Sequence, residues 1–181
     1  MGLDKALLTD REGQELWRRQ LALLEKMGAA EVLISCRVEQ HYLRDSDAQL
    51  VHDRWVDAGP LSGIVRCLEV MSAERLLVLA VDLPGITEEV LNLLLQTPGQ
   101  GGAVYHRHGF LEPLVAAYPK AMAESGRRRL VAGEFALSDW IKEAGDAMQE
   151  VEMPEEWIGR FVNINNPAAW QRWFTRNTNQ D

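Results

Sequence analysis

The sequence has little cysteine and little histidine, which limits the metal and redox chemistry that it can carry. Of its 181 residues, 2 are cysteine and 4 are histidine. Cys36 and Cys67 stand in apolar surroundings, LISCRV and IVRCLEV, and their spacing fits no metal-binding motif. We therefore expect two buried thiols in a protein of a reducing compartment.

Positive charge and long apolar runs are also scarce. The chain has 19 Lys and Arg against 27 Asp and Glu, a formal net charge of −8. A phosphate backbone needs a basic face, so this charge excludes a general nucleic-acid binder, although a small anion in a local basic pocket stays open. No segment approaches the ~18 apolar residues of a membrane span, and no signal peptide precedes the fold. We expect a cytoplasmic protein without a membrane or nucleic-acid partner.

What is present is the alternation of helices and strands of an ordinary globular domain. The composition, 46% hydrophobic and 25% charged, fits one domain over residues 1–181. Apolar spacing predicts helices over 13–27, 59–71, 87–96, 135–144 and near the end of the chain, and strands over 31–36, 49–53, 75–82 and near 147–153. We therefore predict an α/β fold, a three-layer sandwich with a mainly parallel, mixed, Rossmann-like sheet.

Two acidic residues end predicted strands, and a helix begins close to one of them. Asp53 closes QLVHD and Asp82 closes RLLVLAVD, while Pro60 stands at the first turn of the helix that GPLSGI begins. In α/β sheets the ligand crevice lies beyond the carboxyl ends of the strands. A helix N-terminus there offers free N–H groups to an anion. These features predict an anion site at this edge of the sheet.

The chemistry that fits such an edge is a metal-assisted reaction of phosphates. Mg²⁺ prefers one or two carboxylates together with phosphate oxygens and water, and a lysine holds phosphates as a point charge. Each residue also has a plainer interpretation. An acid after a strand often forms a turn or caps a helix, and Lys5 alone reads as a solvated terminal lysine. The pattern by itself indicates an α/β domain with an anion site.

Five stretches in order resemble one family. They are MGLDKALL, VHDRWVDAGPLSGI, LLVLAVDLPGIT, EPLVAAY and FVNINNPAAW, and together they cover nearly the whole chain. In this order and at these separations they resemble the molybdenum cofactor guanylyltransferases, which have the nucleotide-diphospho-sugar transferase fold. The resemblance departs in small ways, because Val81 stands where the family has cysteine and Asn166 stands where it has threonine.

The resemblance implies roles for residues at matching positions. Lys5 corresponds to the lysine that closes the phosphate-binding loop, and Asp82 to the acid that holds Mg²⁺; these two would be the catalytic residues. The residues expected to bind the nucleotide are Lys5, Asp53, Gly59, Pro60, Leu61 and Gly63. Asn163 and Asn165 correspond to the asparagines on the side of the pterin acceptor.

The reaction implied by the resemblance is a guanylyl transfer. A terminal phosphate of molybdopterin attacks the α-phosphate of GTP, and pyrophosphate leaves. The acceptor is already an anion, so no strong general base is needed, and Mg²⁺ with Lys5 would offset the charge of the transition state. Expected partners are GTP, molybdopterin and the proteins that deliver molybdenum cofactor. A CTP-using or sugar-phosphate nucleotidyltransferase of the same fold is the alternative enzyme.

One departure from the family is large. MGLDKALL matches the end of the family's phosphate loop, so the first strand and the glycines of LAGGxSxR have no counterpart before it. That strand would lie in the middle of the sheet, and its loss leaves unpaired backbone groups on both neighbours. Either Met1 is an internal methionine of a longer protein, or the chain is a remnant. A remnant would be completed by another polypeptide or would act as a non-catalytic binding module.

Two further clusters invite a functional interpretation. His106 and His108 stand two apart, which places them on one face of a predicted strand, where they could pair on a metal. A partly exposed strand face is the plainer interpretation. The basic run Arg127–Arg129 could meet a phosphate or a partner protein, although such runs are usually solvated surface.

Overall fold

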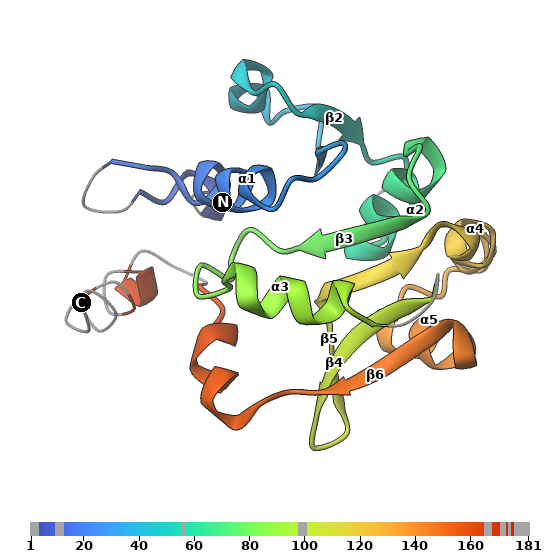
Figure 1. Cartoon of the computed structure of the whole chain (residues 1–181). Coiled ribbons are helices and arrows are strands. Elements are labelled where there is room, and N and C mark those ends of the chain that lie inside the picture. The colour runs from blue at the N-terminus through green and yellow to red at the C-terminus, as the bar shows by residue number, and fades with distance from the viewer. Residues whose placement is uncertain are drawn as a thin grey trace.

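The computed structural model describes residues 4–9, 13–55, 57–97, 101–164, 168–170, 173 and 175. Its helices and strands alternate along most of the chain (Figure 1). The helices are α1 (Leu16–Lys26), α2 (Pro60–Val70), α3 (Glu88–Leu95), α4 (Ala123–Ala132) and α5 (Leu137–Glu143). The strands are β1 (Leu33–Cys36), β2 (Gln49–His52), β3 (Arg75–Leu79), β4 (Gly102–Arg107), β5 (Phe110–Pro119) and β6 (Met148–Glu152). Short 3₁₀ helices include η1 (Lys5–Leu7) and η5 (Glu155–Phe161).

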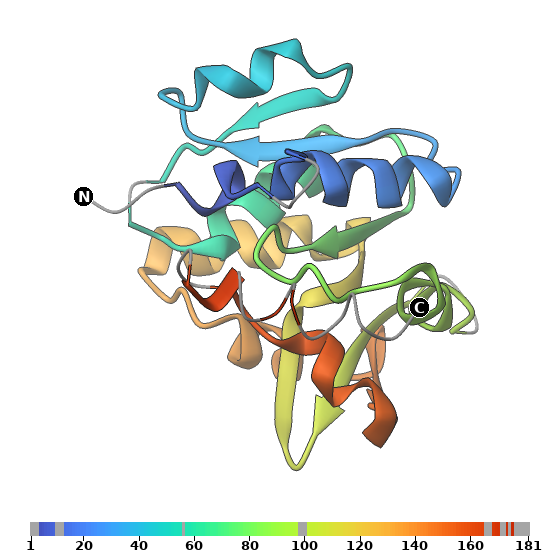
Figure 2. The ribbon, with the colours of Figure 1, turned by 90° about the vertical axis from the view of Figure 1, so that its left-hand side faces the viewer.

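The strands form a mixed arrangement in two pieces. A four-stranded sheet has the order β3-β5-β4-β6, in which β5 is antiparallel to both neighbours and β4 is parallel to β6. β1 and β2 form a separate parallel pair. Helices α1 and α3 lie on one side of the strands, and α2, α4 and α5 lie on the other (Figures 1 and 2). The predicted three-layer α/β fold with a mixed sheet is confirmed.

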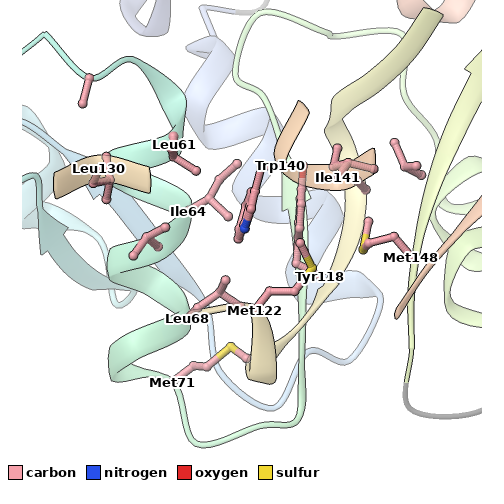
Figure 3. Packing of buried hydrophobic residues seen from close by; sticks show 14 residues of the cluster. Leu61, Ile64, Leu68, Met71, Tyr118, Met122, Leu130, Trp140, Ile141 and Met148 are labelled. Atoms are coloured by element: carbon pink, nitrogen blue, oxygen red, sulfur yellow. The ribbon is translucent and has the colours of Figure 1, made fainter. Parts of the chain in front are cut away.

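Each face of the four-stranded sheet has its own apolar core. On one face, α2, α4 and α5 pack onto β5, and the rings of Tyr118 and Trp140 stack with centroids 5.3 Å apart (Figure 3). On the other face, α3 and η5 cover the sheet. There the Tyr105 hydroxyl donates to the Val90 carbonyl across 2.7 Å. Alternate residues of the central strands therefore supply both cores, as expected for a sheet covered on both faces.

Most predicted elements are present, with differences at a few residues. Pro60 is the first residue of α2, as its place in GPLSGI predicted. Thr87 precedes α3 but makes no capping hydrogen bond with its side chain; instead its hydroxyl accepts from Arg160 across 3.0 Å. The prediction that His106 and His108 share a strand face is wrong. β4 ends at Arg107, and His108 lies in the hairpin turn with a φ of 48°.

The basic run was not predicted to form a helix, but it lies in α4. Arg127 and Arg128 are exposed, in agreement with the solvated interpretation. Arg129 is only 8% exposed, and its guanidinium pairs with Glu143 at 2.6 Å and Glu134 at 3.3 Å. Burying a charge is costly unless it is paired, so the two carboxylates explain how this arginine is tolerated inside the fold.

Candidate functional site at the carboxyl edge of the sheet

Lys5 and Asp82 meet at the carboxyl edge of the strands. Asp82 lies in the loop after β3, and the Lys5 Nζ is 3.2 Å from its carboxylate. The two side chains are 40% and 20% exposed, so the pair is open to solvent on the lysine side. Seventy-seven positions of sequence separate these residues. The fold therefore brings together the two residues that were expected to be catalytic.

Asp4 fixes the short helix that carries Lys5. Its carboxylate accepts from the Ala6 N–H at 3.1 Å, which caps η1, and also from the Gln40 amide and the Tyr42 hydroxyl, each at 2.8 Å. Burial raises the pKa of Asp4, but these hydrogen bonds outweigh it and lower the pKa below its ordinary value. Asp4 is thus ionised and holds the segment of Lys5 in place.

The end of the chain supports Asp82 from another direction. The Asp82 carbonyl accepts from the Ile164 N–H at 2.8 Å, and the Ile164 side chain is fully buried against Leu8 and Leu16. Asn163, which was expected on the acceptor side, is exposed and precedes this anchored residue. It therefore stands one residue from the backbone contact to Asp82. Asn165 lies outside the described residues.

Asp53 follows β2 and belongs to a different local group. The Ser35 hydroxyl donates to its Oδ1 at 3.2 Å, and its N–H donates to the Cys36 carbonyl. Burial raises the pKa of Asp53, and the hydrogen bond from Ser35 opposes that rise. Within the described part of the chain, Asp53 has no ion pair with Lys5. The carboxyl edge thus holds two separate groups, one around Asp82 and one around Asp53.

The first turn of α2 lies beside Asp53, through Gly63. Gly59, the residue before α2, has a φ of 61° and a ψ of −156°, a conformation that suits glycine, and as the N-cap it makes no side-chain hydrogen bond to the helix. Leu61 is fully buried in the core, so only its backbone could meet a ligand. A Cβ at Gly63 would lie 2.1 Å from the Ser35 Oγ. Packing of α2 against β1 therefore already requires glycine at position 63.

The carboxylates of this edge fit Mg²⁺ only as part of a complex with phosphates. Among the described residues, no group of three or more His, Cys, Asp or Glu side chains is placed to hold a metal ion. Asp82 supplies one carboxylate, and Lys5 already neutralises it. Mg²⁺ commonly binds through one or two carboxylates plus phosphate oxygens and water. The residues present therefore fit an ion that arrives with a triphosphate.

Several contacts of this edge were not found from the sequence. Asp4 was not predicted to have a role, although an aspartate directly before Lys5 is a recognisable helix-capping signal. Ser35 ends up beside Asp53 because β1 and β2 pair in parallel with Ser35 opposite Val51. No local pattern gives that register. The contact of Ser35 with Asp53 therefore depends on long-range pairing, whereas the cap by Asp4 is local.

The fold and this edge define a class of protein before any relative is considered. A mixed sheet lies between helical layers, acids follow two of its strands, and a lysine and a helix N-terminus lie at the same edge. This is the arrangement of α/β domains that bind an anionic ligand beyond the strand ends. The chain belongs to the family of the MobA-like NTP transferase domain, whose model matches residues 1–148.

Named relatives agree with this family, and a solved structure shares the fold. A probable molybdenum cofactor guanylyltransferase of Opitutus terrae is 36% identical over 179 residues, 95% of this chain and 87% of that protein. A molybdenum cofactor guanylyltransferase of Pseudomonas putida is 29% identical over 94% of this chain and 88% of its own length. The structure of molybdopterin-guanine dinucleotide biosynthesis protein A from Archaeoglobus fulgidus covers 99% of this chain and 93% of its own, with a TM-score of 0.75 and 23% identity.

A more distant structure shares the fold alone. The 2-C-methyl-D-erythritol 4-phosphate cytidylyltransferase of Thermus thermophilus covers 98% of this chain and all of its own, with a TM-score of 0.71 and 18% identity. In the described part of this chain, none of the helices has the length and hydropathy that crossing a bilayer requires.

Proposed function

We propose that this protein is a guanylyltransferase that moves GMP from GTP to molybdopterin. A terminal phosphate oxygen of the pterin bonds to the α-phosphorus of GTP. The bond from that phosphorus to the bridging oxygen of the β-phosphate breaks, and pyrophosphate leaves with the electron pair. Molybdenum cofactor delivery proteins would receive the product, and we place the reaction in the cytoplasm.

The observation that carries the proposal is the 3.2 Å contact of Lys5 with Asp82 at the carboxyl edge, in a chain whose relatives are named guanylyltransferases. When bound, Mg²⁺ would supply charge neutralisation at the phosphates, with Asp82 as its protein ligand. Lys5 would turn from Asp82 to the phosphates and offset the charge that develops there. The uncapped N–H groups at the start of α2 offer a second place for an anion.

Asn163 and Asp53 would contribute to substrate binding rather than to the transfer step itself. Asn163 lies one residue from the backbone contact to Asp82, and its exposed amide could hold the acceptor. Asp53 lies beside Gly63 in the first turn of α2 and would contact the nucleoside part of GTP. Positioning of two anions by such groups is the main requirement for phosphoryl-type transfer.

The test measures pyrophosphate release from GTP with molybdopterin and Mg²⁺. We expect Asp82→Ala and Lys5→Ala each to lower kcat by about 100-fold or more, as removal of a group that stabilises transition-state charge does. Glu25→Ala, an exposed change on α1, is the matched control and should leave the rate unchanged. Wild-type rates in Asp82→Ala would overturn the assigned role of that residue.

The choice of nucleotide is tested with the same assay. CTP and UTP replace GTP at equal concentration, and we expect turnover with GTP to exceed both. Faster turnover with CTP would favour the alternative enzyme, whose fold the Thermus thermophilus cytidylyltransferase shares. Absence of turnover with every nucleotide, from a protein whose circular dichroism shows it folded, would favour the non-catalytic binding module.

A further inference from the structure

Arg37 is a further cation at the carboxyl edge of the sheet. It follows β1 directly, as Asp53 follows β2, and the parallel register of these two strands pairs Cys36 with His52. Arg37 and Asp53 are therefore the next residues on neighbouring strands. In Figure 2 the carboxyl ends of β1 and β2 lie on the same side of the molecule as η1. The cation thus lies at the edge where the candidate site was found.

One residue, Gln40, fixes the backbone of Arg37. The Arg37 N–H donates to the Gln40 Oε1 at 2.9 Å, and the Gln40 N–H donates to the Arg37 carbonyl at 3.1 Å. The side-chain nitrogen of Gln40 donates in turn to the Asp4 carboxylate at 2.8 Å and to the Tyr42 hydroxyl at 3.0 Å. Because Asp4 caps η1, Gln40 connects the backbone of Arg37 to the segment that carries Lys5.

The guanidinium of Arg37 lies near two carboxylates without pairing with either. Burial is the strongest influence on the pKa of Asp4 and of Asp53 and acts to raise it, and the positive charge of Arg37 is among the influences that lower it. Arg37 is exposed, and within the described part of the chain its side chain forms no ion pair or hydrogen bond. Asp4 already accepts three hydrogen bonds, whereas Asp53 is exposed. Arg37 and Asp53 are therefore both open to a ligand at adjacent strand ends.

The charges around Arg37 favour a neutral ligand over a phosphate. Asp4 and Asp53 place two negative charges near this one cation, and these carboxylates repel an anion. A neutral group that offers donors to a carboxylate and acceptors to a guanidinium fits the pair of Arg37 and Asp53 better. Guanine is such a group, because its N1–H and 2-amino group are neighbouring donors and its O6 and N7 are neighbouring acceptors.

We propose that Arg37 is a specificity-determining residue that selects guanine at this edge. Its guanidinium donates to O6 and N7 of the base, while Asp53 accepts from N1–H and the 2-amino group. Adenine and cytosine carry an amino group in place of the O6 acceptor, so the guanidinium meets a donor there instead. The inference rests on the proposed function in taking GTP as the nucleotide, and it adds the residue that distinguishes the base.

The two separate groups of the carboxyl edge then correspond to the two ends of one nucleotide. Lys5 and Asp82 would meet the phosphates, and Arg37 and Asp53 meet the base. The choice of cation agrees with this division, because the planar fork of arginine donates to two acceptors at once, whereas the lysine ammonium acts as a point charge. Gln40 links the backbone of Arg37 to the segment of Lys5, so the two cations are held in one frame.

The experiment measures the binding of GTP and of 7-deaza-GTP, which lacks the N7 acceptor, to the whole protein with Mg²⁺ by isothermal titration calorimetry. We expect the wild type to bind GTP about tenfold more tightly than 7-deaza-GTP. Arg37→Ala should weaken GTP binding by about tenfold or more and remove the difference between the two nucleotides. A wild type that does not prefer GTP, or an Arg37→Ala variant that weakens both nucleotides equally, as loss of a phosphate contact would, overturns the proposal.

Two matched variants separate base recognition from net charge. Arg44→Ala removes the same charge from an exposed position in η2 (His41–Asp45) and should bind GTP like the wild type. Arg37→Lys keeps the charge but lacks the fork, and it should not restore the preference for GTP over 7-deaza-GTP. Full recovery in Arg37→Lys would contradict the proposal. Molybdopterin and turnover do not enter the measurement, so a protein that selects guanine without transferring GMP would refute the proposed function and leave the role of Arg37 intact.

Discussion

β3 and β5 lie side by side in one sheet and both carry apolar runs, but only β5 has a fully buried stretch. Its residues Val115, Ala116, Ala117 and Tyr118 are 0% exposed, whereas every residue of Arg75–Leu79 is half-buried. The difference lies in their neighbours, since among the described strands β5 has β3 and β4 at its sides and β3 has β5 alone. The comparison shows that an apolar composition alone does not bury a strand fully. Full burial also needs a neighbouring strand on each side.

The largest expected effect comes from the well-packed side. Trp140 is 1% exposed and stacks on Tyr118, so Trp140→Ala would leave a large cavity. We expect a loss of about 3–5 kcal/mol in the free energy of unfolding, measured with urea at equilibrium. A loss below about 1 kcal/mol would mean that Trp140 contributes no more to stability than a typical single residue does.

A smaller loss is expected for the same kind of truncation in β3. Leu77 is half-buried, so part of its side chain is in contact with solvent already. We expect Leu77→Ala to cost about 1–2 kcal/mol, below the usual range for a fully buried leucine. The measurement is urea unfolding at equilibrium, as for Trp140→Ala. A loss as large as that of Trp140→Ala would contradict the difference in burial between β3 and the core of β5.

The ion pair of the candidate site should contribute less than either apolar contact. Lys5 is 40% exposed, and the median surface ion pair contributes ~0–1 kcal/mol. A double-mutant cycle of Lys5→Ala and Asp82→Ala, measured by urea unfolding, should give a coupling of about 0.5 kcal/mol. Activity should fall much further than stability. A coupling of several kcal/mol would instead assign the pair a structural role.

The smallest effect is expected at Asp53, and its sign depends on pH. Burial raises the pKa of this carboxyl in the folded protein, so stability falls as pH rises from the ordinary value of 3.8 through the folded value. Asp53→Asn removes this cost and keeps an oxygen for the Ser35 hydroxyl. We expect a gain of no more than about 0.5 kcal/mol at pH 7. The gain should disappear below pH 3.8, where the carboxyl is protonated in both states.

The elements that local pattern specifies were predicted, and the contacts between them were not. Proline at the start of α2 and the apolar spacing of α1 depend on neighbours within one or two turns, so sequence reading places them. The turn at His108 was not predicted, because a φ of 48° is uncommon for residues other than glycine. Gly109, which follows it, also has a positive φ. The burial of Arg129 was not predicted, because it depends on an ion pair with Glu143, which lies on another helix.

In the candidate site, too, the positions of residues were predicted and most contacts between them were not. Asp82 and Asp53 were placed at the carboxyl edge because each follows an apolar strand. Lys5 and Asp82 lie in contact with each other. The separate grouping of Asp53 with Ser35 depends on the register of β1 and β2. Register is fixed by burial across the whole sheet, which a single stretch of sequence does not contain.

The loop of Asp82 is held by two residues that are distant from it in sequence. Lys5 contacts its carboxylate, and the Ile164 N–H donates to its carbonyl. When only the first hundred residues have left the ribosome, Asp82 is outside it, but Ile164, whose N–H anchors the backbone of Asp82, is not. Contacts of such long separation form late, because closing a long loop costs entropy before the contact is made. The backbone of the Asp82 loop thus gains this support only after the segment around Ile164 has been synthesised.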